Sequence, residues 1–291
     1  MKRLFFIAVF VWVIVAYAAV SGGRTGTSIK PGSFPPVHSN TFFEPGNFYT
    51  GGFSESLSFT GIKGGVIPHH LVADKLIARV FNQLKSQEPK TIVLIGPNHQ
   101  NTGDRMITSS LGWQTPFGIV EIDQKLLEAV CQSAPVKQND KIMSKEHAMG
   151  NIMPFIKYYL PETKVVPLIL HHDITLDEAS ALGEKLAGLI DDDTIVLASV
   201  DFSHYLQSDE AEIKDQETIS ALKAGNMGRI FTMNDDYLDS PASIGVLFKT
   251  MSKLEMNDFT VLNHTNSGVL LGNKNIATTS YITLLFGIEN K

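Results

Sequence analysis

From residue 61 onward, the chain alternates between short runs of strand-forming residues and longer amphipathic segments. This alternation is typical of βαβ units, so we expect a single-domain α/β fold with a mixed, largely parallel sheet and helices on both faces. The predicted strands are residues 64–67, 91–95, 164–170, 194–200, 259–265 and 277–288. The predicted helices, from apolar residues at helical spacing, are 71–85, 123–134, 144–160, 175–190, 208–224 and 240–254.

Three of these helices have recognisable start signals. Thr175 precedes one helix as an N-cap, and Ser240 with Pro241 at the first helical position begins another. We expect Ser144 to cap the helix at 144–160, which could be interrupted near Gly150 or Pro154 because proline and glycine break helices.

The N-terminus differs from the rest of the chain. Lys2 and Arg3 precede an uncharged apolar run that ends in small residues, which is the order of a secretory signal. The run is slightly short for a membrane-spanning helix, which needs roughly 20 residues. We therefore expect export with cleavage near Ala18 or Ala19, and an uncleaved membrane anchor is the alternative. Either way the protein would be periplasmic or extracellular, touching a membrane only through residues 1–22.

Composition narrows the remaining possibilities. Residues 23–44 are rich in Gly, Ser, Thr and Pro and are expected to form a tether, followed by one domain at 45–291. The net charge of −6 gives no general electrostatic reason to bind nucleic acid. The single cysteine, Cys131, excludes an intrachain disulfide and lies at a helical position typical of a buried, inert thiol.

Most of the histidines follow the predicted strands directly. If these strands are parallel neighbours, the imidazoles meet at the carboxyl edge of the sheet, where ligands bind in open α/β folds. Neutral imidazole is the commonest metal ligand in proteins. The pattern therefore predicts a metal site at this edge. Six of the nine histidines are involved: His69, His70, His99, His171, His172 and His204.

A metal site of this kind needs at least one more ligand. Two histidines and one carboxylate form a centre that leaves coordination positions open for O₂ or substrate. The spacing of the acidic residues does not choose among them, because none stands in a tight metal-binding motif. The open candidates are Glu146, Asp201, Asp236 and Asp239.

Seven segments resemble, in the same order, the Memo family, which includes the bacterial AmmeMemoRadiSam system protein B. They are GGVIPHH, VLIGPNH, WQTPFGIVEID, KEHAMGNIMPFI, VVPLIL, ASVDFSHY and SIGVLF, and the resemblance covers roughly residues 45–287. That family is similar in fold to the class III extradiol dioxygenases, whose iron sits on two histidines and a carboxylate. The resemblance implies an extradiol-dioxygenase-like domain with a metal site.

Carried over residue by residue, the resemblance implies that His69 and His99 are the first two metal ligands. The family commonly has a cysteine as the third ligand, shortly before a segment that matches SIGVLF, and Asp239 stands there instead. A slip in this alignment would move the role to Asp235 or Asp236. A carboxylate suits Fe(II), Mn(II) or Zn(II) better than Cu(I), so we expect a divalent metal, with Fe(II) favoured.

The resemblance also implies roles beside the metal. Asp201 and His204 match a segment that contributes to the family's pocket, and His204 is the expected acid or base. Glu146 and His147 match a Glu-His pair to which no role is assigned here. Tyr49 lies in an early segment of the family and could shield the site.

The resemblance implies a metal-dependent oxidoreductase, in which the metal holds O₂ and an anionic substrate in adjacent positions while His204 moves a proton. Two alternatives stay open. The protein could be a non-catalytic member that binds a metal, a peptide or a partner protein, or it could be a zinc hydrolase. The residues alone do not identify the substrate, the metal or the oligomeric state.

Overall fold

A computed structural model describes residues 36–43, 46 and 58–290. The predicted signal or anchor at residues 1–22, most of the predicted tether, and Tyr49 lie outside the described residues. Within the described ranges, no helix combines the length and the apolar character needed to cross a membrane.

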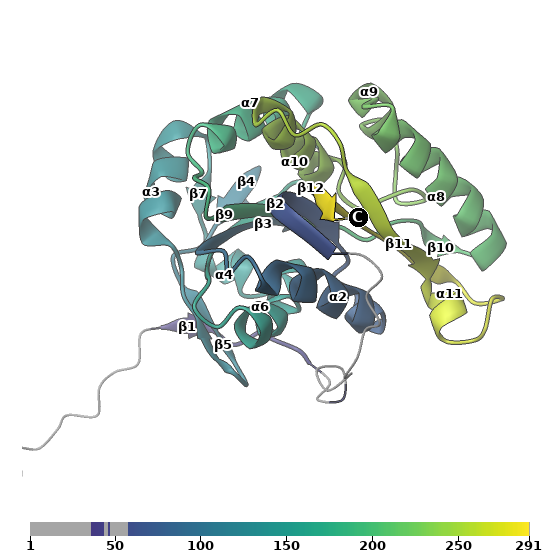
Figure 1. The fold of residues 1–291 in the computed structure, drawn as a ribbon, viewed down its shortest axis with the longest axis horizontal. Coiled ribbons are helices and arrows are strands. Elements are labelled where there is room, and N and C mark those ends of the chain that lie inside the picture. Colours follow the sequence, from purple (N-terminus) through teal and green to yellow (C-terminus); the bar gives the residue numbers. More distant parts are fainter. Residues whose placement is uncertain (1–35, 44–45, 47–57, 291) are drawn as a thin grey trace, which may run out of the picture. The chain divides into compact units, whose positions relative to one another are not determined.

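Nine of the described strands form one mixed sheet (Figure 1). They are β2 (Ser58–Ile67), β3 (Thr91–Pro97), β4 (Met106–Thr108), β7 (Lys137–Gln138), β8 (Lys164–Leu170), β9 (Thr194–Ser199), β10 (His204–Leu206), β11 (Thr260–Asn266) and β12 (Thr278–Asn290). Their order is β10-β12-β2-β9-β3-β8-β4-β7, and β11 pairs with β12. The central strands β2, β9, β3 and β8 are parallel, whereas β12 and β4 run antiparallel to their neighbours β2 and β8. The predicted mixed sheet with a parallel centre is confirmed.

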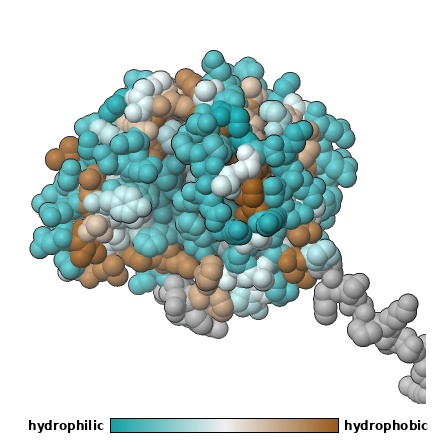
Figure 2. All heavy atoms as spheres, turned by 180° about the vertical axis from the view of Figure 1, so that it is seen from behind, coloured by the Kyte–Doolittle hydropathy of each residue, from teal (hydrophilic) through white to brown (hydrophobic). Residues whose placement is uncertain are grey.

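Helices cover both faces of this sheet, as predicted. α7 (Leu176–Ala187) and α10 (Pro241–Lys253) pack together on one face, and α2 (Asp74–Lys85) and α6 (Met153–Tyr159) lie on the other (Figure 1). The cover is needed because β3 and β9 are buried along their whole length, so both of their faces carry apolar side chains. The surface seen from behind is mostly hydrophilic, with apolar side chains in smaller patches (Figure 2). Further helices among the described residues include η2 (Leu71–Ala73), α3 (Gln124–Ser133), α8 (Ser208–Lys223), α9 (Met227–Ile230) and α11 (Ser267–Leu270).

Two helix starts follow the sequence closely. Thr175 forms a capping box with Glu178 at the start of α7, in which each side chain bonds the other residue's backbone N–H. Ser240 caps α10, and Pro241 takes the first helical position. Both signals act within one turn of the chain, which is why they could be predicted without tertiary contacts.

The helix predicted at 144–160 is interrupted after Gly150, at one of the two expected places, but its predicted start is wrong. Within this range the chain forms two short helices, α5 (His147–Gly150) and α6, and α4 (Asp140–Met143) precedes them. Ser144 ends α4 rather than beginning a helix, and Glu146 caps α5 by accepting a hydrogen bond from the backbone N–H of Ala148. Because the helix is broken here, the side chains of Glu146 and His147 reach the edge of the sheet.

A small second sheet ties the first described residues to the domain. β1 (Val37–His38) pairs in parallel with β5 (Gly112–Thr115), which pairs with β6 (Gly118–Val120). His38 Nε2 also lies 2.7 Å from Ser109 Oγ. Residues 36–43, which the sequence assigned to the tether, therefore include a strand that packs on the domain.

Candidate metal centre

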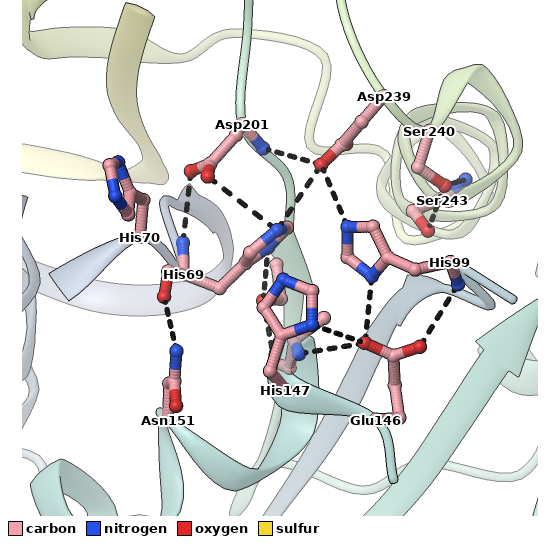
Figure 3. Close-up of polar contacts among 12 residues, drawn as sticks. His69, His70, His99, Glu146, His147, Asn151, Asp201, Asp239, Ser240 and Ser243 are labelled. Atoms are coloured by element: carbon pink, nitrogen blue, oxygen red, sulfur yellow. Dashed lines mark hydrogen bonds and ion pairs between the residues drawn. The ribbon is translucent and has the colours of Figure 1, made fainter. Parts of the chain in front are cut away.

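The parallel strands bring three imidazoles and three carboxylates together at the carboxyl edge of the sheet (Figure 3). His69 follows β2, His99 follows β3, and Asp201 follows β9, which lies between them. These residues converge because neighbouring parallel strands end at the same edge. The remaining members of the cluster are Glu146, His147 and Asp239.

The buried ring of His69 is oriented by Ser199. Its Nδ1 lies 3.2 Å from Ser199 Oγ, and that hydroxyl donates its own proton to the backbone oxygen of Ala148 at 2.8 Å. Ser199 Oγ therefore accepts from Nδ1–H, which fixes the proton of the neutral imidazole on Nδ1. The other nitrogen, Nε2, faces the Oδ2 atoms of Asp239 at 3.2 Å and Asp201 at 3.5 Å.

His99 is oriented in the same way by Glu146. The ring donates from Nδ1 to Glu146 Oε1 at 2.7 Å, and the backbone N–H of His99 donates to Oε2 at 3.0 Å. Glu146 is buried, and its pKa stays below the ordinary value because hydrogen bonds and the charge of His99 outweigh the opposing effect of burial. Nε2 of His99 is left facing Asp239 Oδ2 at 3.8 Å. Both histidines thus present the same nitrogen to the same carboxylate.

Asp239 reaches the site through backbone contacts with the segment that follows β9. Its N–H donates to the carbonyl of Asp201 at 3.1 Å, and a β-bridge joins Phe202 to Leu238. The N–H of Asp201 donates in turn to Asp239 Oδ2 at 3.3 Å. Asp239 Oδ1 is buried and has no hydrogen-bond partner. A buried acceptor without a partner is costly, so this atom is available to a cation or a donor.

The carboxylates set the charge of His69. Burial alone would lower the pKa of this ring, but Asp201 and Asp239 outweigh it and raise the pKa to about 9. A proton on Nε2 of His69 therefore neutralises part of the carboxylate charge when no metal is bound. A metal ion that binds there has to displace that proton.

Two separations between donor atoms can be compared with those around a single metal ion. Ligands about 2.1 Å from one ion lie roughly 3.0–3.4 Å from each other. The separation between His69 Nε2 and Asp239 Oδ2 falls in this range, and that between His99 Nε2 and Asp239 Oδ2 is slightly longer. Donor atoms within 4.8 Å of one another form two groups that share His69: one with His99 and His147, the other with Asp201 and Asp239.

His147 is a member of the cluster that the sequence did not assign. Its ring stacks on His99, with centroids 4.1 Å apart, and meets His69 edge-on at 5.3 Å. Burial, with help from the neighbouring His99 and His69, lowers its pKa to about 4. The ring is therefore neutral at pH 7 and has a lone pair available for a metal. The Glu-His pair in the sequence was the signal that could have placed it here.

The other strand-end histidines differ in position. His70 points away from the centre, and its Nδ1 lies 2.6 Å from the hydroxyl of Tyr281 (Figure 3). His171 bonds Asp173 and the backbone of Asn101 beside the site. His172 and His204 line the cavity described next.

A cavity of about 460 Å³ opens beside the centre. His99, His204 and Asp239 contribute to its wall, and Nδ1 of His204 is buried without a hydrogen-bond partner. A larger cavity of about 610 Å³ lies between α7 and α10, but no histidine is among the described residues that line it. A further cavity of about 400 Å³ also reaches the cluster, at His147. Among these cavities, only the one of about 460 Å³ has both His99 and Asp239 among its described lining residues.

A known protein family matches most of this chain. The Memo-like protein family matches residues 51–285. This chain belongs to the Memo-like family. A MEMO1 family protein of Pyrobaculum aerophilum is 31% identical over 234 residues, covering 77% of this chain and 83% of the relative. A MEMO1 family protein of Aquifex aeolicus is 27% identical over 236 residues, covering 77% of this chain and 85% of the relative.

A solved structure supports the fold as well. The Memo-like chain matches the crystal structure of an uncharacterized protein from Escherichia coli K12 with a TM-score of 0.53 and 13% sequence identity. The match covers 76% of this chain and 99% of the other. At this identity the likeness concerns the fold alone.

Two predicted pocket residues and one alternative ligand are also placed by the Memo-like structure. Asp201 touches His69 through both of its oxygens, because Oδ1 accepts from the backbone N–H of His69 at 3.0 Å. His204 lines the cavity. Asp235, the alternative third ligand, lines the cavity as well. Ser199 was missed, because a serine inside a buried strand gives no sequence signal of this role.

Proposed function

We propose that this Memo-like protein binds one divalent metal ion through His69, His99 and Asp239 and uses it as a dioxygenase-like oxidoreductase. The observation that carries the proposal is the shared orientation of the two rings. Each histidine has its Nδ1 held by a hydrogen-bond partner and its Nε2 directed at Asp239 Oδ2. This is the arrangement by which proteins prepare imidazoles for a metal.

The donor set supports Fe(II) as the ion. Two imidazoles and a carboxylate are the ligands of non-heme iron centres, and the site has no thiolate to favour Cu(I). Bound Fe(II) would supply open coordination positions for O₂ and for an oxygen atom of the substrate. Zn(II) and Mn(II) fit the same ligands, so the choice of Fe(II) is itself a part of the proposal that metal analysis has to test.

The chain's own residues supply the remaining functions. Glu146 and Ser199 hold the two ligand rings, and Asp201 fixes the backbone of His69. His204 lines the cavity with an unpartnered Nδ1, so it is placed to hold or move a proton next to a bound molecule. Together these groups prepare the site before a metal or a substrate arrives.

Metal analysis of the purified protein tests the proposal. We expect about one equivalent of metal in the wild type after loading with Fe(II) under anaerobic conditions. The double variant His69→Ala, His99→Ala should lose it. His171→Ala is the matched control, because this histidine also follows a strand but contacts Asp173 instead of the cluster. Equal metal content in the wild type and the double variant would refute the metal site.

Activity measurements separate the three functional classes. The Fe(II)-loaded protein should consume O₂ with a hydroxylated aromatic substrate. The variant His204→Gln should lose that consumption while its metal content stays unchanged. Turnover that survives the removal of O₂ would instead identify a hydrolase. Tight metal binding with no turnover across a broad panel of substrates would identify a binding protein.

A further inference from the structure

We propose that the cavity beside the metal centre selects small molecules without net negative charge, with hydroxyl or ammonium donors. The inference rests on the proposed function, because it takes this cavity as the place where the substrate binds. It differs from the anionic substrate that the sequence led us to expect. Three observations carry it: the charges around the cavity, its unpartnered acceptors, and an exposed tyrosine at its wall.

The charges around the cavity are negative. Asp235 and Asp239 line the cavity, and neither lysine nor arginine is among its described lining residues. Asp201 and Glu146 lie directly behind, in contact with the two ligand histidines. A divalent ion brings two positive charges against the three carboxylates of Asp201, Asp239 and Glu146. With neutral imidazoles the loaded centre therefore keeps a net negative charge, and a second anion would be repelled.

The wall of the cavity also contains two buried acceptor atoms that have no hydrogen-bond partner. Asn98 is 3% exposed and lines the cavity, and its Nδ2 donates to the backbone oxygen of Thr102, so its Oδ1 is the free end of the amide. That Oδ1 atom has no hydrogen-bond partner, and neither has Asp239 Oδ1. Buried acceptors of this kind are normally paired. A ligand that supplies O–H or N–H donors would satisfy them, whereas a second carboxylate would add only acceptors.

Tyr205 supplies an aromatic face at the same place. Its side chain is 80% exposed although it lines the cavity, and its backbone has a φ of 65°, a left-handed conformation that non-glycine residues rarely adopt. Backbone strain of this sort gathers at functional sites. The ring lies 5.7 Å from that of His204. An exposed tyrosine here can stack on a flat ligand or attract a cation through its π face.

A matched set of ligands tests the charge selection. Dopamine, 4-ethylcatechol and 3,4-dihydroxyphenylacetate share one ring and differ mainly in the charge of the side chain, which is positive, zero and negative. Their binding to the Zn(II)-loaded protein is measured by calorimetry without O₂, so that no turnover occurs. We expect dopamine to bind about tenfold tighter than the anionic compound, as one unit charge a few ångströms from another predicts in a partly solvated site. The neutral compound should fall between them.

Two variants locate the selection in this cavity. Asp235→Asn should reduce the preference for dopamine, whereas the neighbouring Asp236→Asn should not, because Asp236 is absent from the described lining residues. Tyr205→Asn should weaken all three ligands, because asparagine tolerates the left-handed backbone but lacks the ring.

The outcomes separate the two proposals. Equal or tighter binding of 3,4-dihydroxyphenylacetate, or no binding of any of the three to a zinc-loaded protein, would overturn the charge selection and leave the metal site standing. Failure to load zinc would overturn the metal site. The same titration on the metal-free protein then decides the selection, since the carboxylates are compensated even less without an ion.

Discussion

Metal binding to this protein should weaken roughly a hundredfold between its limiting value above pH 9 and pH 7, because the ion competes with a proton at His69. The pKa of this ring is raised to about 9 by Asp201 and Asp239, which outweigh burial. At pH 7 the free protein therefore holds the proton, and binding must release it. Two pH units below the pKa correspond to about 2.7 kcal/mol, or a factor of ~100.

The direction of the pH dependence follows from the protonation of His69 in the metal-free protein. Below the pKa of His69, each unit of falling pH costs the ion a factor of ~10 in apparent affinity, and above it the affinity is level. The raised pKa of His69 has the opposite effect on the stability of the metal-free protein, which falls as the pH rises. The stabilisation is complete below pH 6.5, the pKa of the ring in the unfolded chain, and it is lost as the pH rises through about 9, the pKa in the folded protein. The metal-free protein should thus be about 3 kcal/mol less stable at pH 10 than at pH 6 from this group alone.

The assay is a zinc titration against a competing chelator from pH 6.5 to pH 10, corrected for the chelator's own protonation. Calorimetry in buffers of different ionisation enthalpy counts the released protons, and we expect close to one at pH 7.5. Asp201→Asn should move the break in the curve to lower pH, because the charge of Asp201 helps to raise the pKa of His69. A level affinity between pH 7 and pH 8.5, with no proton released, would refute the reasoning.

Three further predictions concern the packing around Gly150, the hydrogen-bonded pair of His264 and Asp215, and export. Gly150→Ala should lower the free energy of unfolding by about 2 kcal/mol, because a Cβ there would lie 1.9 Å from a backbone oxygen. Gly188→Ala is the control and should cost little, because no atom lies nearer than 3.6 Å to a Cβ at that position. Equal losses in thermal unfolding would contradict the packing argument. His264→Ala should destabilise the fold by about 3 kcal/mol below pH 6.5, since it removes the ring nitrogen 2.8 Å from the fully buried Asp215. A hydrogen bond from this ring to Asp215 raises the pKa of His264 despite burial, so the cost should shrink as the pH rises through that raised value, and a pH-independent cost would argue against the pair. Mass spectrometry of the cellular protein should find an N-terminus close to Ala19 outside the cytoplasm, and an intact chain in the cytosol would rule out export.

Local sequence was sufficient for most elements of the sheet and its helices. The parallel centre was predictable from the alternation of strands and helices, and the caps at Thr175 and Ser240 from side chains that bond the first turn of their own helix. The start of the helical segment at 144–160 was not, because its apolar spacing matches one long helix as well as two short ones. Its breaks depend on Glu146, whose carboxylate is held by the backbone and ring of His99, 47 residues away in the chain.

The candidate site shows the same division. Histidines that follow predicted parallel strands are expected at the carboxyl edge of a sheet, so the sequence indicated where a centre could form. Only the tertiary structure decided which of them face it. His69 and His70 are neighbours in the chain, yet one ring is directed at Asp239 and the other is bonded to Tyr281. Side chains in a loop point where their partners hold them, and those partners come from strands and turns far away in the sequence. That is also why Asp239 joins the group through a bridge to the segment after β9, which no spacing in the sequence encodes.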